Sequence, residues 1–498
     1  MGQNNLSLPG VVTTEGQASV PSFNGIRPLD GLLVGKFADG DLLTPTLVGP
    51  EDINRDFGGL VVGSAAYDAA QFFARGPRRL YVIRVKGTAA SISVVDQQTP
   101  TPVAKMTIEA LVDGTWANYD ADGGPGSTAI GIRAVVAAGT LSETFKLTIT
   151  AYLAHGATNR SITEEYDNLS LESAATRYFG TYVTAMSKIV KVTDLAPSSH
   201  AAANLPATGN KDLASGAEPT YATGIAEHAA IRGRLAMFMD TGDSTSNTAL
   251  IAAVNARSLS DGAGTISADA AIAILNQPPG TTHANYVVAG AATVEPRVKL
   301  MGDYKLALDP VANASGYMRP AGIYAGIRCA KEPWFSVLNQ FVSDISGSEL
   351  SLTRAQMEAE LQAGIQLIQL WPDDTSRGMR LLSDIQSDGS QTFVRLVRDY
   401  EAAIGLANLA GFVGMHQGVE DPDPVRQSVV ALFTAFYEAR KEQKIIERYT
   451  VKCDSDNNTE TTVALMELHV RREVKYKNVI ETIADELVAG TESVIALA

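Results

Sequence analysis

The stretch YDAAQFFARGPRRLYVIRV at residues 67–85 places the strongest constraint on how this chain folds. Its first half has the spacing of an amphipathic helix, with Phe72 and Phe73 on the apolar face, and Gly76 and Pro77 end that helix. The hexapeptide LYVIRV that follows is apolar on both faces, so it predicts a central strand that is covered on both sides. Such a sheet needs helices on each face, which favours an α/β core.

Other segments fit the same core. LLVG at residues 32–35 predicts a buried strand, and TPTLVGPEDINRDFGG at residues 44–59 predicts a further strand followed by a short helix. Further along, LAMFMD at residues 235–240 predicts a strand, TALIAAVNARSL at residues 248–259 a helix, and NYVVAG at residues 285–290 another strand. Strand, helix and strand at this spacing indicate a parallel βαβ unit.

The composition of the chain changes along its 498 residues, and this length suits about three domains. Residues 88–192 are β-branched and rich in turns, which indicates a β-rich domain inserted after the strand at residues 80–85. The first 24 residues contain no period long enough for an independent element, so they are either a frayed terminus or a strand that needs a neighbour's sheet edge. The predicted division is an N-terminal arm at 1–24, the first part of the α/β core at 25–87, the inserted outer domain at 88–192, the second part of the core at 193–330, a C-terminal inner domain at 331–470, and a C-terminal strand and arm at 471–498.

Charge and cysteine content exclude several classes of protein. The net charge is −15 and the sequence pI is about 4.9, so we expect no direct binding of nucleic acid and no binding to anionic membranes. The two cysteines, Cys329 and Cys453, form neither a disulfide framework nor a zinc set. The first ten residues lack the basic and apolar parts of a secretory signal, and the longest apolar run, at residues 402–415, is too short to cross a bilayer.

The sequence contains few candidate catalytic or ligand-binding motifs. It contains no GxxxxGK[ST] phosphate loop and no GxGxxG opening a helix after a strand, and its histidines stand singly. The best enzymatic candidate is MDTGDSTSN, where Asp240, Asp243 and Ser244 follow a strand, as ligand or nucleophile groups do in α/β enzymes. Helix capping demands the same residue types at the same place, and we favour that interpretation. No catalytic, cofactor-binding or metal-ligating residue is assigned.

Three arginines, Arg75, Arg78 and Arg79, follow the helix that carries Phe72 and Phe73. They have the chemistry to bind phosphate or to pair with carboxylates of a neighbouring copy. No glycine-rich loop accompanies them, so we favour a contact between copies, with the two phenylalanines as core scaffold.

Several motifs together resemble one family. They are SLPGVVTTE at residues 7–15, TPTLVGPEDINRDFGG, AAYDAAQFFARGPRRLYVIRV, RPAGIYAGIRCAKEPWFS at residues 319–336, and RQSVVALFTAFYEARK followed by YTVKCD. In this order and spacing they resemble the contractile tail sheath proteins of long-tailed, myovirus-type bacteriophages and related contractile injection particles. The resemblance covers most of the chain outside residues 88–192. It implies a multi-domain fold with an α/β core built from N- and C-terminal parts, an inserted β-rich domain and extended terminal arms.

The resemblance also implies a function. Sheath subunits form stacked rings around a tail tube, and the sheath contracts to drive the tube through the bacterial envelope for genome delivery. The implied partners are further copies of the chain, the tube protein, and baseplate and tail terminator proteins, in a virion tail assembled in the host cytoplasm. No enzymatic activity and no cofactor are implied. The alternatives are the sheath of a genome-free contractile particle, an α/β hydrolase or nucleotide-binding enzyme, and a β-rich surface protein.

Two groups of residues take roles from this resemblance. Strands exchanged between subunits are expected at both ends of the chain, at Leu8, Pro9, Gly10, Val11, Val12, Val479, Ile480 and Ile483. The predicted helix at residues 425–444 would face the tube through Arg440, Lys441 and Lys444, with Arg448 just beyond. The alternative is that these cations only complement the carboxyl end of the helix.

Overall fold

The computed structural model describes residues 29–77, 79–124, 126–155, 158–195, 202–258, 267, 269–370, 378–416, 422–459, 461 and 468–477. By its internal contacts the chain divides into two compact units. One is Arg27–Asp399, and the other combines Tyr400–Ala498 with Met1–Ile26. The division falls inside the predicted inner domain of residues 331–470.

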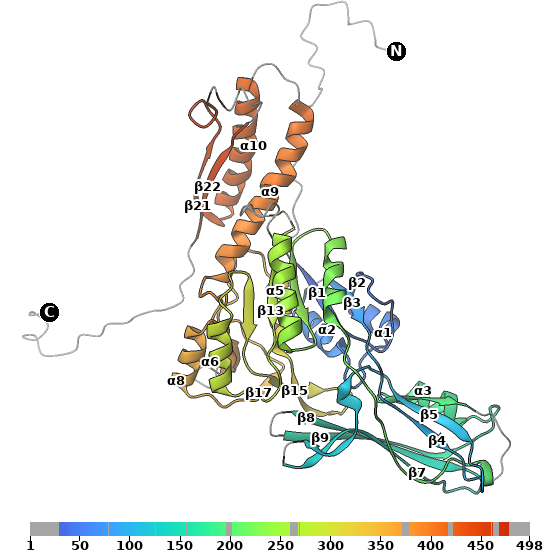
Figure 1. Ribbon diagram of the computed structural model, residues 1–498. Coiled ribbons are helices and arrows are strands. Elements are labelled where there is room, and N and C mark those ends of the chain that lie inside the picture. The colour runs from blue at the N-terminus through green and yellow to red at the C-terminus, as the bar shows by residue number, and fades with distance from the viewer. Residues whose placement is uncertain are drawn as a thin grey trace, which may run out of the picture. The chain divides into compact units, whose positions relative to one another are not determined.

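A seven-stranded sheet forms the core of the first unit (Figure 1). Every neighbouring pair is parallel except β2–β3, which is antiparallel. In spatial order the strands are β18 (Ile365–Gln366), β14 (Val298–Met301), β13 (Ala271–Leu275), β12 (Leu235–Met239), β1 (Asp30–Lys36), β3 (Leu80–Val85) and β2 (Thr46–Val48).

Helices cover both faces of this sheet, as the sequence predicts. On one face α2 (Ala66–Phe73) and α7 (Pro320–Cys329) pack together over Leu33, Val82 and Phe238. On the other face α4 (Tyr221–Ala226) and α5 (Ser244–Ser258) pack over Val34 and Ile83. Successive residues of β1 and β3 alternate between the two cores, because side chains of a strand point to opposite faces. The remaining elements around the sheet are α1 (Asp52–Asp56), the 3₁₀ turn η4 (Glu227–Ala230), α6 (His283–Ala292) and α8 (Arg354–Gln362).

One predicted strand is wrong. NYVVAG at residues 285–290 lies within the helix α6, whose first turn is capped by the Thr282 side chain accepting from Asn285 N. The strand that completes the βαβ unit is β13, with the sequence AIAIL. A short uncharged apolar segment has no clear period, so β-branched residues alone misassign it.

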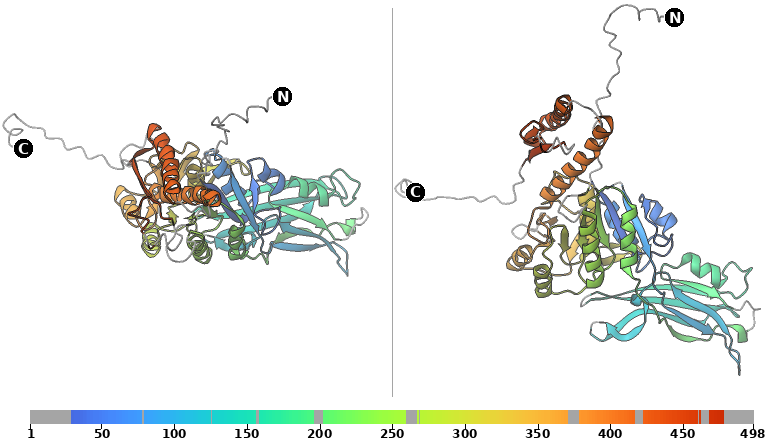
Figure 2. Two further views of the ribbon diagram at one scale, coloured as in Figure 1. Left: turned by 90° about the horizontal axis from the view of Figure 1, so that it is seen from above. Right: turned by 45° about the horizontal axis from the view of Figure 1, so that its top comes forward.

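The inserted β-rich domain is present and extends past its predicted end at residue 192 (Figure 2). Its last strand, β11, pairs with β7, and an isolated bridge joins Thr88 to Ala217 where the chain enters and leaves the insert. One sheet has the order β10-β5-β4 and the other β11-β7-β8-β9, with β6 on β7, around a separate hydrophobic core. The elements are β4 (Ser91–Val95), β5 (Ala104–Ala110), η2 (Thr115–Ala117), β6 (Asp120–Gly124), β7 (Thr128–Ala138), β8 (Phe145–His155), β9 (Thr158–Leu169), α3 (Phe179–Met186), β10 (Val190–Asp194), η3 (Ala202–Asn204) and β11 (Gly209–Asp212).

Two small sheets complete the first unit. β15 (Lys305–Asp309) lies between β16 (Ala314–Met318) and β17 (Ile345–Ser348), and β19 (Ile368–Leu370) pairs with β20 (Met379–Leu381). The second unit holds most of α9 (Thr392–His416), together with α10 (Pro422–Glu442), β21 (Ile446–Lys452) and β22 (Arg471–Tyr476). α10 packs against β21, as expected for the late helix and strand.

Candidate assembly site

The two phenylalanines of α2 are scaffold. Phe72 is fully buried and stacks on Phe238 of β12, with ring centroids 5.9 Å apart. Phe73 is partly buried and meets the Phe72 ring edge-on at 5.4 Å. Together they fix α2 on the sheet.

The arginines after α2 have partners inside their own unit. Arg75 forms two hydrogen bonds with the carboxylate of Asp344, and its side chain is only 8% exposed. Arg79 lies 3.3 Å from the carboxylate of Asp30 and donates to the Tyr81 hydroxyl. Arg75 and Arg79 therefore both have partners within their own unit, and the contact between copies that the sequence favoured stays a prediction. Arg78 lies outside the described residues.

The strand end at MDTGDSTSN has the geometry of a helix cap. Asp243 accepts hydrogen bonds from Thr245 N and Ser246 N, both at 3.0 Å, and Ser244 is the first residue of α5. Asp240 is buried and accepts from Lys36 N and from the Tyr221 hydroxyl, at 3.1 and 2.6 Å. These carboxylates organise backbone and side chains of the core, as the capping interpretation expects.

A cavity of about 590 Å³ lies beside this strand end. Charged groups that line it are engaged with one another, Lys36 with Glu218 at 2.7 Å and Arg319 with Asp68 at 2.9 Å. Burial raises the pKa of Asp68 to about 7, although Arg319 opposes the shift. The cavity thus contains structural ion pairs, and within the described residues we identify no nucleophile with a base positioned to activate it.

The described residues also provide no cluster of metal-binding side chains. No group of three or more His, Cys, Asp and Glu side chains there is arranged to hold a metal ion. None of the described helices is both long and apolar enough to cross a membrane.

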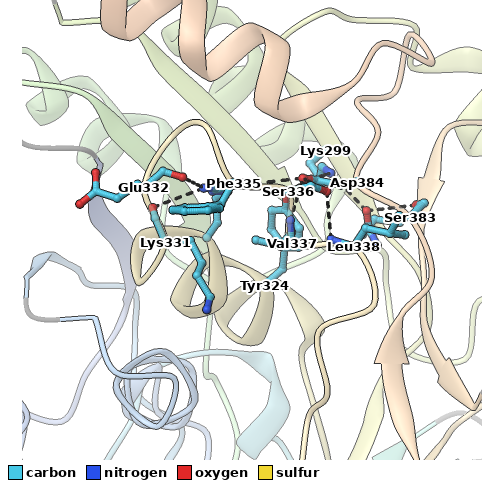
Figure 3. A network of polar contacts seen from close by, with 12 residues as sticks. Lys299, Tyr324, Lys331, Glu332, Phe335, Ser336, Val337, Leu338, Ser383 and Asp384 are labelled. Atoms are coloured by element: carbon cyan, nitrogen blue, oxygen red, sulfur yellow. Dashed lines mark hydrogen bonds and ion pairs between the residues drawn. The ribbon is translucent and has the colours of Figure 1, made fainter. Parts of the chain in front are cut away.

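Several fully buried charged groups form a structural network around Asp384 (Figure 3). Its carboxylate accepts from Lys299 Nζ at 3.1 Å, from the Tyr324 hydroxyl at 2.9 Å and from Val337 N at 3.1 Å. Burial alone would raise the pKa of Asp384, but the charges of Lys299 and Arg328 outweigh it and hold this pKa below its usual range. Arg328 also donates to the carbonyls of Glu332 and Phe335, so the network fixes the loop after α7.

The second unit presents a small sheet with open edges. β21 and β22 pair antiparallel, and among the described residues neither has a second partner strand. A two-stranded sheet is marginally stable by itself, and its free edges are templates for added strands. The predicted donor residues, Leu8 to Val12, Val479, Ile480 and Ile483, lie outside the described residues.

Glu401 of α9 ties this sheet to its helices. Its carboxylate accepts from the Tyr437 hydroxyl of α10 at 2.6 Å and from the Tyr476 hydroxyl of β22. Arg472 of β22 donates to the Glu401 carbonyl at 3.1 Å and lies 3.5 Å from its carboxylate. The edges of the sheet are therefore presented on a fixed support.

The cations at the end of α10 separate into two kinds. Arg440 is buried, donates to the Tyr400 hydroxyl at 2.6 Å and lies over the Phe436 ring at 4.4 Å. Its predicted tube-facing position is not what the structure shows, because the aromatic side chains enclose its guanidinium. Lys441, Lys444 and Arg448 are exposed.

Comparison with known proteins supports the fold. No protein-family model and no curated protein matches the sequence. Among solved structures, the helical sheath of the anti-feeding prophage in its contracted state covers 97% of this chain and 99% of its own, at 13% identity and a TM-score of 0.54. Two sheath tail proteins have lower TM-scores. The protein from Desulfitobacterium hafniense is 15% identical, covers 92% of this chain and 98% of its own, and has a TM-score of 0.48. The protein from Listeria innocua is 11% identical, covers 91% of this chain and 96% of its own, and has a TM-score of 0.46.

The fold assignment rests on the first of these matches, which spans nearly the whole of both chains. The chain has the multi-domain fold of a contractile sheath subunit, and the fold implied by the sequence resemblance is confirmed.

Proposed function

We propose that this chain is the structural subunit of a contractile tail sheath, which polymerises around a tail tube and contracts to drive the tube through the bacterial envelope. The observation that carries the proposal is the shared fold with a contracted sheath subunit over 97% of the chain. The motif resemblance along the sequence supports it independently.

The proposed contraction requires no catalysed reaction. Buried ionic groups of the first unit form pairs such as Lys299–Asp384 and Arg319–Asp68, which hold segments of the fold together. The free energy of contraction then comes from two different packings of the same subunits, as in other bistable assemblies. Accordingly we expect neither an enzymatic activity nor a cofactor.

Strand exchange is the proposed link between subunits. Residues 8–12 of one copy and residues 479–483 of another would add to the open edges of β21 and β22. Main-chain hydrogen bonds to a donated strand persist while the donor body rotates, so the copies stay attached during contraction. Head-to-tail contacts of this kind repeat into an open helical array.

The proposed partners beyond further copies are the tube protein, the baseplate and a tail terminator. The location would be the virion tail, assembled in the host cytoplasm, with genome delivery as the outcome. The alternative within this class is a genome-free particle. Nucleic acid in purified particles would distinguish the two.

The exposed cations of the second unit are the proposed tube contact. The double variant Lys441→Glu, Lys444→Glu is expected to weaken co-assembly with tubes roughly tenfold, because two attractive surface charges become repulsive toward acidic tube groups. The measurement is the fraction of sheath that co-sediments with tubes at low salt. Arg440 is left unchanged, since its substitution would disturb the buried contacts of α10.

A matched control reverses two partly exposed lysines of the insert, Lys146→Glu and Lys191→Glu, for the same change in net charge. It is expected to co-assemble normally. Equal co-assembly of both double variants would leave Lys441 and Lys444 with only a helix-capping role.

Negative-stain electron microscopy of the purified full-length chain tests the proposed function directly. Tubes built of stacked rings are expected on concentration or on addition of tail tubes. A chain that stays monomeric under both conditions would contradict the proposal.

A further inference from the structure

Two exposed apolar patches lie on the first unit. The edge patch consists of Leu42, Leu43 and Leu47, which are 46%, 40% and 45% exposed. The helix patch consists of Ala284, Val288, Ala291 and Val294, of which Val288 and Val294 are 67% and 63% exposed. Contiguous exposed apolar groups of this kind mark interaction surfaces.

The loop that carries the edge patch contains a strained backbone conformation. Leu43 has φ +54°, a left-handed conformation that is unusual for a bulky side chain. Its N–H donates to the Arg84 carbonyl, and the Arg84 guanidinium donates to the carbonyls of Phe37, Ala38 and Gly40. The loop that carries Leu42 and Leu43 is therefore fixed next to β2, the strand that contains Leu47 and lies at one end of the sheet. Strain maintained by surrounding contacts is typical of functional surfaces.

Three residues of the helix patch lie on α6, and Val294 follows just after its end. Residues 284–294 contain no charge, which is unusual for a surface helix. Tyr286 and Gly290 face inward, and Gly290 approaches the Ala363 carbonyl so closely that a Cβ atom would lie 2.4 Å from it. The outward residues 284, 288 and 291 follow the spacing of one helix face. A solvated helix normally carries charges there, so this face is suited to contact with another apolar surface.

The two patches lie at opposite ends of the same sheet. β2 is the last strand at one end, while α6 packs against β18 at the other end. Figure 1 shows α6 and α8 at the end remote from β2 and α1, and the right view of Figure 2 agrees. Patches at opposite ends of one body can join successive copies head to tail.

The charged residues near the edge patch favour a contact between an edge patch and a helix patch over a contact between two edge patches. The exposed acidic residues Asp39, Asp41 and Glu51 lie within four residues of these leucines in sequence, and Asp56 pairs with Arg55. Two edge patches brought together would place these like charges against each other, which disfavours a symmetric pair. The uncharged face of α6 approaches the edge patch without such repulsion.

We propose that the helix patch of one subunit docks on the edge patch of the next, as a head-to-tail contact between copies of this chain. This contact rests on the proposed sheath function and assigns it a specific surface. The contact buries the leucines and valines that each free subunit exposes.

Complementation between variants tests the docking. Val288→Glu and Leu47→Glu should each abolish polymers and leave the thermal unfolding midpoint unchanged, because both side chains are exposed. Leu141→Glu, at a residue 61% exposed in the insert, is the matched control and should polymerise normally. A mixture of Val288→Glu with Leu47→Glu retains one intact helix patch and one intact edge patch. It should therefore sediment as a larger species than either variant alone, without polymers of wild-type length.

Normal polymers from both variants, when the wild type polymerises, would overturn the docking and leave the sheath function intact. A wild type that never polymerises would contradict the sheath function and this inference with it. If either glutamate variant fails to fold, cysteine cross-linking decides. Val288→Cys chains mixed with Leu43→Cys chains should form mixed disulfide dimers within polymers. Absence of these dimers, or an equal yield from Val288→Cys alone, overturns the docking.

Discussion

A chain that lacks both residues 1–24 and residues 478–498 is expected to remain folded and to form no sheath. Each donated strand of about five residues would make several main-chain hydrogen bonds at about 1 kcal/mol each. Their loss leaves the edges of β21 and β22 without partners from other copies. Sedimentation should show complete loss of polymers, while circular dichroism reports an intact fold. Normal polymers from this double truncation would refute strand exchange.

Proline substitutions in the N-terminal arm test strand exchange without shortening the chain. Val11→Pro with Val12→Pro removes two backbone donors from the predicted strand and should block polymerisation as the truncation does. Gln3→Pro with Asn4→Pro, outside the predicted strand, is the matched control and should have no effect. If the control is equally defective, the arm acts through something other than a donated strand.

Replacement of Asp384 by alanine is expected to lower the free energy of unfolding of the first unit by about 3–5 kcal/mol. The change leaves Lys299 fully buried without its carboxylate and removes the acceptor for Tyr324 and Val337. Domains are stable by only about 5–15 kcal/mol, so the variant should unfold at much lower urea concentration. Urea titration monitored by tryptophan fluorescence measures the shift.

Two variants serve as references for Asp384→Ala. Glu358→Gln, in an exposed pair with Arg354, should change the free energy of unfolding by less than about 0.5 kcal/mol. Asp384→Leu combined with Lys299→Met should recover part of the loss, because Lys299 is then no longer buried without its carboxylate, while Arg328 keeps its hydrogen bonds to backbone carbonyls. An unfolding midpoint for Asp384→Ala equal to that of Glu358→Gln would show that the network contributes little.

The core of the fold could be predicted because its signals are local. LYVIRV is apolar at alternate positions on both faces, and β3 indeed contributes Leu80 and Val82 to one core and Ile83 and Val85 to the other. Two features escaped prediction for lack of a local signal. AIAIL at β13 is an apolar run of only five residues, and the insert returns through β11, whose sequence GNKD has no strand character.

The roles of single charged residues were harder to predict, because they depend on partners far away in sequence. Arg75 pairs with Asp344, which is 269 residues away, and Asp384 pairs with Lys299, which is 85 residues away. Arg440 has the same local sequence context as the exposed Lys441, yet Tyr400 encloses it. Asp243 is the exception: a carboxylate just before a helix caps it through adjacent backbone groups, which the sequence shows directly.

The central claim is that identical copies stay linked through strands donated to the sheet of β21 and β22. Helical reconstruction by cryo-electron microscopy of polymers of the full-length chain tests it most directly. The account predicts a four-stranded sheet in every subunit, in which residues 8–12 and 479–483 come from two other copies. A polymer in which β21 and β22 remain a two-stranded sheet, or in which both arms pair within their own subunit, would contradict it.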